Sequence, residues 1–191
     1  TGDVFLDYLV LGVRHIWGGL DHLLFVFGLL LLIAGPRRLL WTITAFTLGH
    51  SVTLALATLG VIQYPVDLIE VLIAISVFTL AVTLTSKNQE RLLWRSPGWL
   101  AAGFGLLHGM GFAGALLEIG LPSKNLLLAL FSFNAGIEVG QILFIVAFLL
   151  PWHYLKKRSS RRFGVARWAS IYLLGSLAAY WTVERSVIAF G

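Results

Sequence analysis

The sequence predicts an all-α integral membrane protein in which residues 1–191 form a single transmembrane domain. Hydrophobic residues make up 58% of the chain and charged residues 12%, whereas soluble domains have about 25% charged residues. The mean hydropathy is +0.87. Apolar runs of about 20 residues, the length that crosses the hydrocarbon core of a bilayer, recur along the chain.

Six of these runs are long enough to form transmembrane helices, and turn-forming or charged residues separate them. They lie near residues 18–35, 39–61, 66–86, 98–119, 125–150 and 165–187. Residues 1–17 form a shorter and more polar segment, which carries Asp3, Asp7, Arg14 and His15. This segment indicates an amphipathic helix at the membrane surface, or a re-entrant segment that dips into it.

The basic residues predict the orientation of the six helices. Eleven of the 14 Lys and Arg residues lie in or beside the loops after the first, third and fifth runs, and loops rich in basic residues stay on the cytoplasmic side. These residues are Arg37, Arg38, Lys87, Arg91, Arg95, Lys156, Lys157, Arg158, Arg161, Arg162 and Arg167. We therefore expect both termini on the periplasmic or extracellular side, where acidic residues gather and attract cations.

The net charge of +5 thus reflects membrane topology. We expect the lipid bilayer as the surroundings of the chain and no binding to nucleic acid.

A short internal similarity relates the two halves of the chain. A shift of 86 residues superposes Gly19-Leu20-Asp21-His22 on Gly105-Leu106-Leu107-His108, and a shift of 87 superposes Phe46 and Gly49 on Phe133 and Gly136. With three helices in each half, the second copy would be inverted, as in many secondary transporters. Chance similarity in a sequence rich in Gly and Leu is an equal alternative to this inverted repeat of three plus three helices.

Several ionisable residues fall within the apolar runs, where they are costly unless they are paired or bound to an ion. They are Asp21, His22, His50, His108 and Glu138, and His15 lies close before the first run. The chain has no cysteine, which excludes thiolate ligands. A set of imidazoles and carboxylates suits nickel, cobalt, zinc or copper(II). We therefore predict a site for a divalent transition metal ion at these residues, inside the membrane.

Three polar residues are expected to support this site. Ser51 is adjacent to His50. Asn134 and Gln141 share one helical face with Glu138, because they lie four residues before it and three residues after it.

Structural interpretations compete with this prediction. Asp21 would also serve as a helix cap at the outer interface, and His50 as a hydrogen-bond partner of a neighbouring helix. We expect Glu70 in a solvated helix end, with a role in funnelling ions as the minor alternative. Glu118 and His153 are expected at the membrane interfaces.

Four segments of the chain resemble the HupE/UreJ family, in particular its second subgroup, whose members are membrane proteins associated with hydrogenase and urease accessory functions. They are His15-Ile-Trp-Gly-Gly-Leu-Asp21-His22-Leu-Leu-Phe, Thr44-Ala-Phe-Thr-Leu-Gly-His50-Ser-Val-Thr-Leu, Gly105-Leu-Leu-His108-Gly-Met-Gly-Phe-Ala and Phe133-Asn134-Ala-Gly-Ile-Glu138-Val-Gly-Gln141. The resemblance implies a nickel or cobalt permease in the inner membrane of a bacterium. The chain departs from the first subgroup at Phe104 and Gly111, where that subgroup has His and Glu.

The leading hypothesis is a six-helix permease for a divalent transition metal, nickel before cobalt, zinc or copper, with His15 as a gate or capture ligand. A second hypothesis is a membrane-embedded zinc-dependent hydrolase. It would use His22, His50 and His108 as ligands and Asp21 or Glu138 as general base. A third is a metal-binding accessory subunit of a larger membrane complex. A homo-oligomer is compatible with each of these hypotheses.

Overall fold

The computed structural model describes residues 2–86, 96–119 and 125–191, except for the side chains at 115 and 117–119. The described residues form seven α-helices and no strand, as the composition predicts. The helices are α1 (Gly2–Gly18), α2 (Leu20–Leu32), α3 (Pro36–Thr58), α4 (Val66–Thr85), α6 (Pro97–Ile119), α7 (Leu126–Arg158) and α8 (Ser160–Phe190). The predicted loop residues Lys87, Arg91, Arg95 and Lys124 and the side chain of Glu118 lie outside the described residues.

Helix α2 lies within the first predicted span, 18–35, and is shorter than it. Helix α2 has only 13 residues, which extend over about 20 Å and are too few to cross a bilayer alone. It is joined to α1 by a bend of 77°. At Gly19 the backbone is extended, with φ −89° and ψ 100°. The segment predicted as amphipathic or re-entrant is therefore a 17-residue helix, which continues at a sharp angle into α2.

Several described helices have the dimensions of membrane spans. By length and composition, α3, α4 and α7 qualify, and the bent pair α1 and α2 adds a fourth if it counts as one span. Helices α6 and α8, with 23 and 31 residues, lie beside them. The chain thus has the character of a membrane protein, and six spans stay a prediction.

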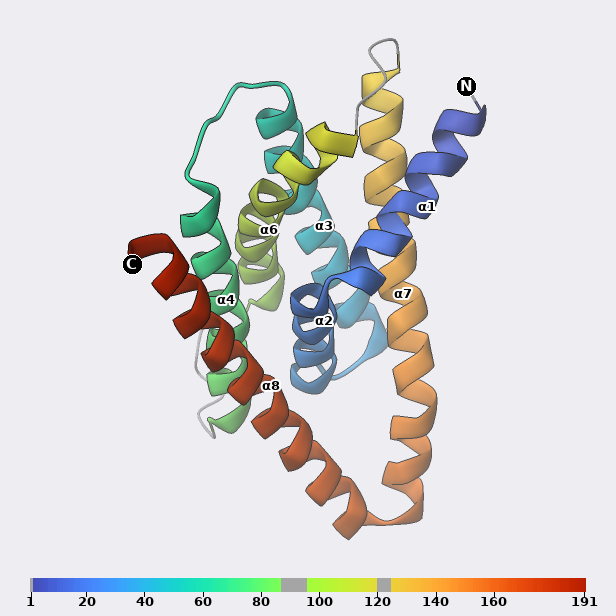
Figure 1. Ribbon diagram of the computed structural model, residues 1–191. Coiled ribbons are helices and arrows are strands. Elements are labelled where there is room, and N and C mark those ends of the chain that lie inside the picture. The colour runs from blue at the N-terminus through green and yellow to red at the C-terminus, as the bar shows by residue number, and fades with distance from the viewer. Residues whose placement is uncertain (1, 87–95, 120–124) are drawn as a thin grey trace.

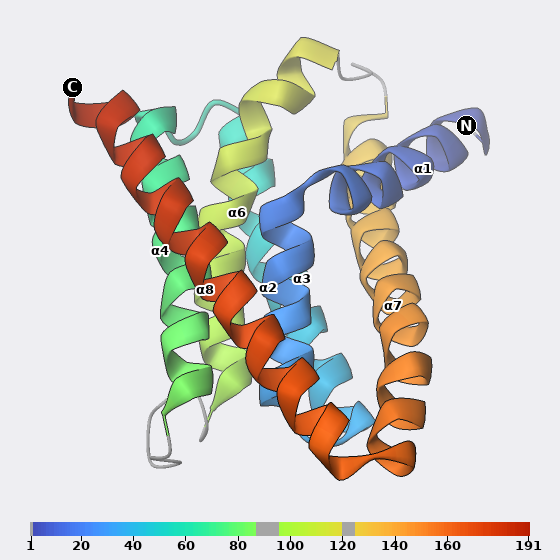
Figure 2. The same ribbon diagram turned by 60° about the horizontal axis from the view of Figure 1, so that its bottom comes forward.

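The helices pack in three pairs around α2. Helix α1 packs against α7, α3 against α6, and α4 against α8. Figures 1 and 2 show α2 in the middle of the bundle, between the α4 and α8 pair on one side and α7 on the other. Both views also place the two termini at the same end of the bundle, opposite the connection between α7 and α8.

Glycines let the paired backbones come very close. A Cβ on Gly12 of α1 would overlap with Phe133 O of α7, and a Cβ on Gly105 of α6 would overlap with Phe46 O of α3. Neither glycine can be replaced without moving a backbone. His15 and His108 therefore occupy equivalent positions in the two pairs, because His15 follows Gly12 by three residues and His108 follows Gly105 by three residues.

The packing therefore changes the internal correspondence predicted from the sequence. The equivalence of Phe46 and Phe133 agrees with the contacts, but the structural counterpart of His108 is His15 and not His22. The α1 and α7 pair runs toward the α7–α8 connection, and the α3 and α6 pair runs away from it. The two pairs are thus inverted relative to one another.

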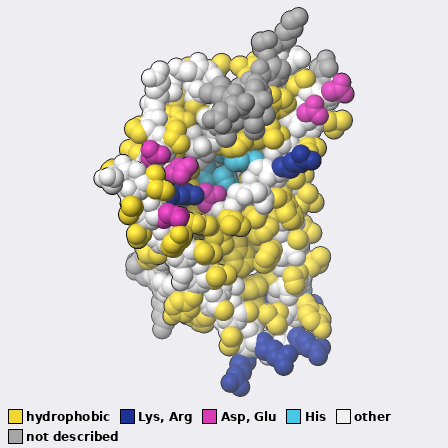
Figure 3. Space-filling view, in the orientation of Figure 1, with side chains coloured by type: hydrophobic (Ala, Val, Ile, Leu, Met, Phe, Trp, Pro, Cys, Tyr) yellow, Lys and Arg dark blue, Asp and Glu magenta, His cyan; other side chains and the backbone are white. Residues whose placement is uncertain are grey.

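Charge is separated along the length of the bundle. In Figure 3, basic side chains gather at the end where α7 and α8 join, acidic side chains lie in the opposite half, and a broad hydrophobic surface lies between them. Large apolar side chains such as Leu48, Phe131 and Leu173 are more than 60% exposed. This distribution agrees with the predicted topology, whose orientation in the membrane stays a prediction.

Candidate metal centre

Three histidine side chains from three helices converge inside the bundle. One nitrogen from each of His15 (α1), His22 (α2) and His50 (α3) lies within 4.8 Å of the others. The Nε2 atom of each ring is buried and has no hydrogen-bond partner. Buried nitrogens without a partner are costly. A metal ion bound between these imidazoles would satisfy them, and we refer to the three residues as the histidine cluster.

The bend between α1 and α2 brings His15 and His22 together. In a straight helix, residues seven apart are separated by about 10 Å along the axis. Here the two ring centroids are 4.5 Å apart. A Cβ on Gly19 would lie 2.7 Å from His22 Nδ1. The glycine at this position therefore supplies both the bend and the space for the imidazole.

Asp21 and Asn134 determine which ring nitrogen of His22 and of His50 is free to bind a metal ion. His22 Nδ1 lies 3.1 Å from Asp21 Oδ1, and His50 Nδ1 lies 3.2 Å from Asn134 Oδ1. Asn134 is itself oriented, because its Nδ2 donates to Leu130 O at 2.8 Å. Since both oxygens accept hydrogen bonds, each Nδ1 carries the proton and each Nε2 keeps its lone pair. Such outer partners are typical of histidines that bind metals.

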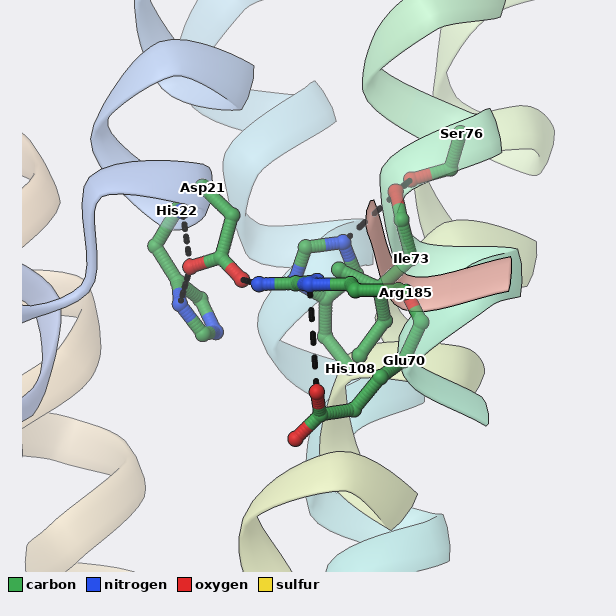
Figure 4. Close-up of polar contacts among 7 residues, drawn as sticks. All are labelled: Asp21, His22, Glu70, Ile73, Ser76, His108 and Arg185. Atoms are coloured by element: carbon green, nitrogen blue, oxygen red, sulfur yellow. Dashed lines mark hydrogen bonds and ion pairs between the residues drawn. The ribbon is translucent and has the colours of Figure 1, made fainter. Parts of the chain in front are cut away.

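His108 adjoins the histidine cluster as a fourth imidazole. Its ring centroid lies 4.8 Å from that of His22, and it is fully buried. Ser76 Oγ donates to Ile73 O at 2.6 Å and lies 3.4 Å from His108 Nε2. Figure 4 shows Ser76 and Ile73 on one side of this ring. The His108 Nδ1 atom is buried without a partner, so it is available on the other side.

Glu138, Gln141 and Ser51 do not join the histidines. Glu138 Oε1 accepts a hydrogen bond from Thr44 Oγ1 at 2.6 Å, and Gln141 Oε1 accepts one from Thr47 Oγ1 at 3.2 Å. Ser51 donates to Thr47 O at 2.7 Å. Glu138 lies one turn of α7 beyond the residue that bonds His50, toward the basic end of the bundle. These side chains form a separate polar group between α3 and α7.

A cleft of about 350 Å³ leads to the imidazoles from the side of the acidic residues. His15, His22 and His108 line it, and Figure 3 shows histidine side chains at the bottom of this hollow. Gly111, which stands where the first subgroup of the family has Glu, also lines the cleft. A Cβ at this position would lie 2.7 Å from Ile73 Cδ1.

Arg185 was missed as a functional residue by sequence reasoning. Its guanidinium lies between Asp21 and Glu70 at the mouth of the cleft, as Figure 4 shows. NH2 is 3.2 Å from Asp21 Oδ2, and NH1 donates to Glu70 O at 3.1 Å. A signal was present in the sequence, because Arg185 is a single basic residue near the end of an apolar run on the predicted acidic side.

His153 and Glu70 lie outside the histidine cluster. His153 is exposed near the basic end of α7, and its position at a membrane interface stays a prediction. Glu70, which was expected in a solvated helix end, is half-exposed in the first turns of α4 but pairs with Arg185, with Nε and Oε2 3.8 Å apart.

Comparison with known proteins gives one match. The family model described as HupE / UreJ protein matches residues 1–185, which include all of the imidazoles, Asp21, Glu138 and Arg185. No curated protein and no solved structure matches the chain. Because the family model covers nearly the whole length, the chain belongs to the HupE/UreJ family.

Proposed function

We propose that the protein is a permease for a divalent transition metal ion, nickel before cobalt, with the ion bound by His15, His22 and His50. One observation carries the proposal: imidazoles from three helices each offer a nitrogen within 4.8 Å of the others, and each ring has a buried Nε2 without a hydrogen-bond partner. An open cleft reaches two of the three rings, His15 and His22. Neutral imidazoles bind nickel, cobalt, zinc and copper well. The resemblance to HupE/UreJ proteins favours nickel among them, and we treat zinc and copper as the competing ions.

The positions of the polar side chains support a path through the bundle. The cleft is lined by Asp21 and Glu70 and reaches His15 and His22 of the histidine cluster. Beyond His50, the polar group that contains Glu138 lies between α3 and α7, toward the basic end. Transport needs binding that is strong enough to remove water and weak enough to release the ion. An oxygen ligand that follows the imidazoles along the path would allow release of the ion. We assign this role to Glu138.

A site shared by several helices also suits transport. The three imidazoles come from α1, α2 and α3, and the first two helices meet at a sharp bend. A change in this bend alters the distance between His15 and His22 and with it the affinity for the ion. Opening and closing of the site can therefore be coupled to movement of α1.

The contacts of the acidic residues favour transport over a zinc hydrolase. Three imidazoles and an open position are also the ligand set of catalytic zinc, but hydrolysis needs a general base beside the bound water. Asp21 bonds His22 and Arg185, and Glu138 bonds Thr44. Neither Asp21 nor Glu138 is free beside the histidine cluster, so neither carboxylate is in place as the general base that this hypothesis assigned to them.

Uptake of nickel into proteoliposomes tests the proposal. We expect His22→Ala and His50→Ala to reduce uptake to the level of empty vesicles while the protein keeps its helical content. His153→Ala is the matched control, because this exposed histidine lies at the other end of the bundle. Wild-type uptake in either cluster variant, or loss of uptake in the control, would overturn the assignment.

A further inference from the structure

We propose that Arg185 determines the metal specificity of the cleft: its guanidinium holds the carboxylates of Asp21 and Glu70 and so excludes cations that bind through oxygen, such as Ca²⁺ and Mg²⁺. The inference rests on the proposed function, because it assigns the specificity of the same path. It concerns the mouth of the cleft and not the histidine cluster.

The guanidinium of Arg185 is held by three helices. Its NH2 atom is 3.2 Å from Asp21 Oδ2 at the start of α2, and its Nε atom is 3.8 Å from Glu70 Oε2 in α4. NH1 donates to Glu70 O at 3.1 Å. The ring of Trp181, one turn earlier in α8, lies 5.8 Å from Cζ. The side chain is only 20% exposed, so its charge is fixed in place in the mouth.

This arrangement removes the ligands that hard cations need. Ca²⁺ and Mg²⁺ bind carboxylate and carbonyl oxygens. Asp21 and Glu70 contribute two negative charges to the mouth, and both are engaged by the one positive charge of Arg185. A hard cation arriving there finds these carboxylates occupied and a positive charge between them.

For a transition metal ion, the balance between ligand binding and repulsion by Arg185 is different. Its main ligands are the neutral imidazoles of His15 and His22, which line the same cleft and do not contact Arg185. The gain from nitrogen ligands offsets the repulsion by one positive charge, and this gain is much smaller for Ca²⁺ and Mg²⁺. Arg185 therefore discriminates between the two classes of ion, because it occupies the carboxylate oxygens and leaves the imidazole nitrogens free. A fixed Arg serves as an electrostatic barrier to cations in other pores.

The contact between Asp21 and His22 does not depend on Arg185. Asp21 Oδ1 accepts from the backbone N of His22 at 2.9 Å and lies 3.1 Å from its Nδ1, whereas Arg185 contacts the other oxygen. Replacing Arg185 thus frees Oδ2 of Asp21 and the carboxylate of Glu70, and it leaves the orientation of His22 in place.

The experiment is calcium and nickel binding by the purified full chain in nanodiscs, measured by calorimetry for wild type, Arg185→Gln and Arg185→Gln with Glu70→Gln. We expect Arg185→Gln to bind Ca²⁺ more tightly by on the order of tenfold or more, since one unit charge beside a divalent ion has an effect of at least this size. Nickel affinity should rise by a smaller factor, because the main ligands of nickel are the imidazoles of the histidine cluster and not the carboxylates that the substitution frees. The second substitution should reverse the gain in calcium affinity. The control is Arg161→Gln, at an exposed position in the basic segment.

The outcomes separate this inference from the proposed function. Unchanged calcium affinity in Arg185→Gln, or a gain that persists in the double variant, would overturn the role of Arg185. Absence of nickel binding to the wild type would overturn the proposed function and leave the calcium result to decide the role of Arg185. If Arg185→Gln does not fold, Arg185→Lys serves instead: a lysine pairs with only one carboxylate, so calcium affinity should rise by a smaller factor, and no rise would contradict the inference.

Discussion

His50 Nδ1 lies 3.2 Å from Asn134 Oδ1, so a residue of α7 sets which nitrogen of the α3 imidazole is free. The opposite nitrogen, Nε2, is buried without a hydrogen-bond partner, next to the imidazoles of His15 and His22. One contact between two helices therefore fixes the tautomer and the direction of a ligand. The histidine cluster depends on α7 although α7 contributes no imidazole to it.

Asn134→Leu removes this acceptor while keeping the size of the side chain. The His50 ring is then free to rotate, and we expect nickel affinity to fall by about 10- to 100-fold, the usual effect of losing an outer partner of a metal ligand. Calorimetry on the purified protein measures it. Ser132→Ala is the control, since this buried hydroxyl donates to Leu128 O of its own helix. Equal affinities in the two variants would show that Asn134 does not orient His50.

Gly19→Ala tests the role of the bend. A Cβ at residue 19 would lie 2.7 Å from His22 Nδ1 and 3.3 Å from Asp21 Oδ1, so the imidazole must move. We expect weaker nickel binding without unfolding, measured by calorimetry and circular dichroism. Gly18→Ala is closely matched, because nothing lies within 4 Å of a Cβ at that position. Wild-type nickel affinity in both Gly19→Ala and Gly18→Ala would contradict the role of Gly19 in placing His22.

Gly105→Ala tests the contact between α3 and α6. The added Cβ would overlap with Phe46 O, and overpacking of this kind costs about 1–3 kcal/mol or more, because backbones must separate. Thermal unfolding in detergent should show a clear loss of stability. Gly103→Ala, on the same helix with open space around its Cβ, should be neutral or slightly stabilising. A stable Gly105→Ala protein would contradict the close approach of the two helices.

Glu138→Gln separates binding from transport. The side chain bonds Thr44 and lies outside the histidine cluster, so we expect nickel affinity at the cluster to be kept while flux through proteoliposomes falls. Glu184→Gln is the control, since this exposed carboxylate bonds only Tyr180. If Glu138→Gln abolished nickel binding, Glu138 would be a ligand of the first site, as the sequence had suggested. Unchanged flux would remove it from the path.

The sequence was sufficient to find most of the histidine cluster. Ionisable residues in apolar runs point to function because burial makes them costly, and this argument identified His22 and His50, with His15 close before the first run. The fold class was predicted from the high content of apolar residues and the low content of charged ones.

The other features of the site depend on contacts between helices, which the periodicity of the sequence does not reveal. Glu138 shares a helical face with Asn134, but Thr44 of α3 meets it before any imidazole does. Arg185 and Asp21 are 164 residues apart in the chain, and the sequence holds no local signal for their pairing. The match between His15 and His108 was hidden because it lies in the contacts of Gly12 and Gly105 with other helices.

X-ray absorption spectroscopy of the nickel-loaded protein in nanodiscs tests the central claim most directly. The account predicts a first coordination shell with at least three imidazole nitrogens in the wild type, and loss of that signal in His50→Ala but not in His153→Ala. A shell made of oxygen alone, or a wild-type spectrum in His50→Ala, would contradict it.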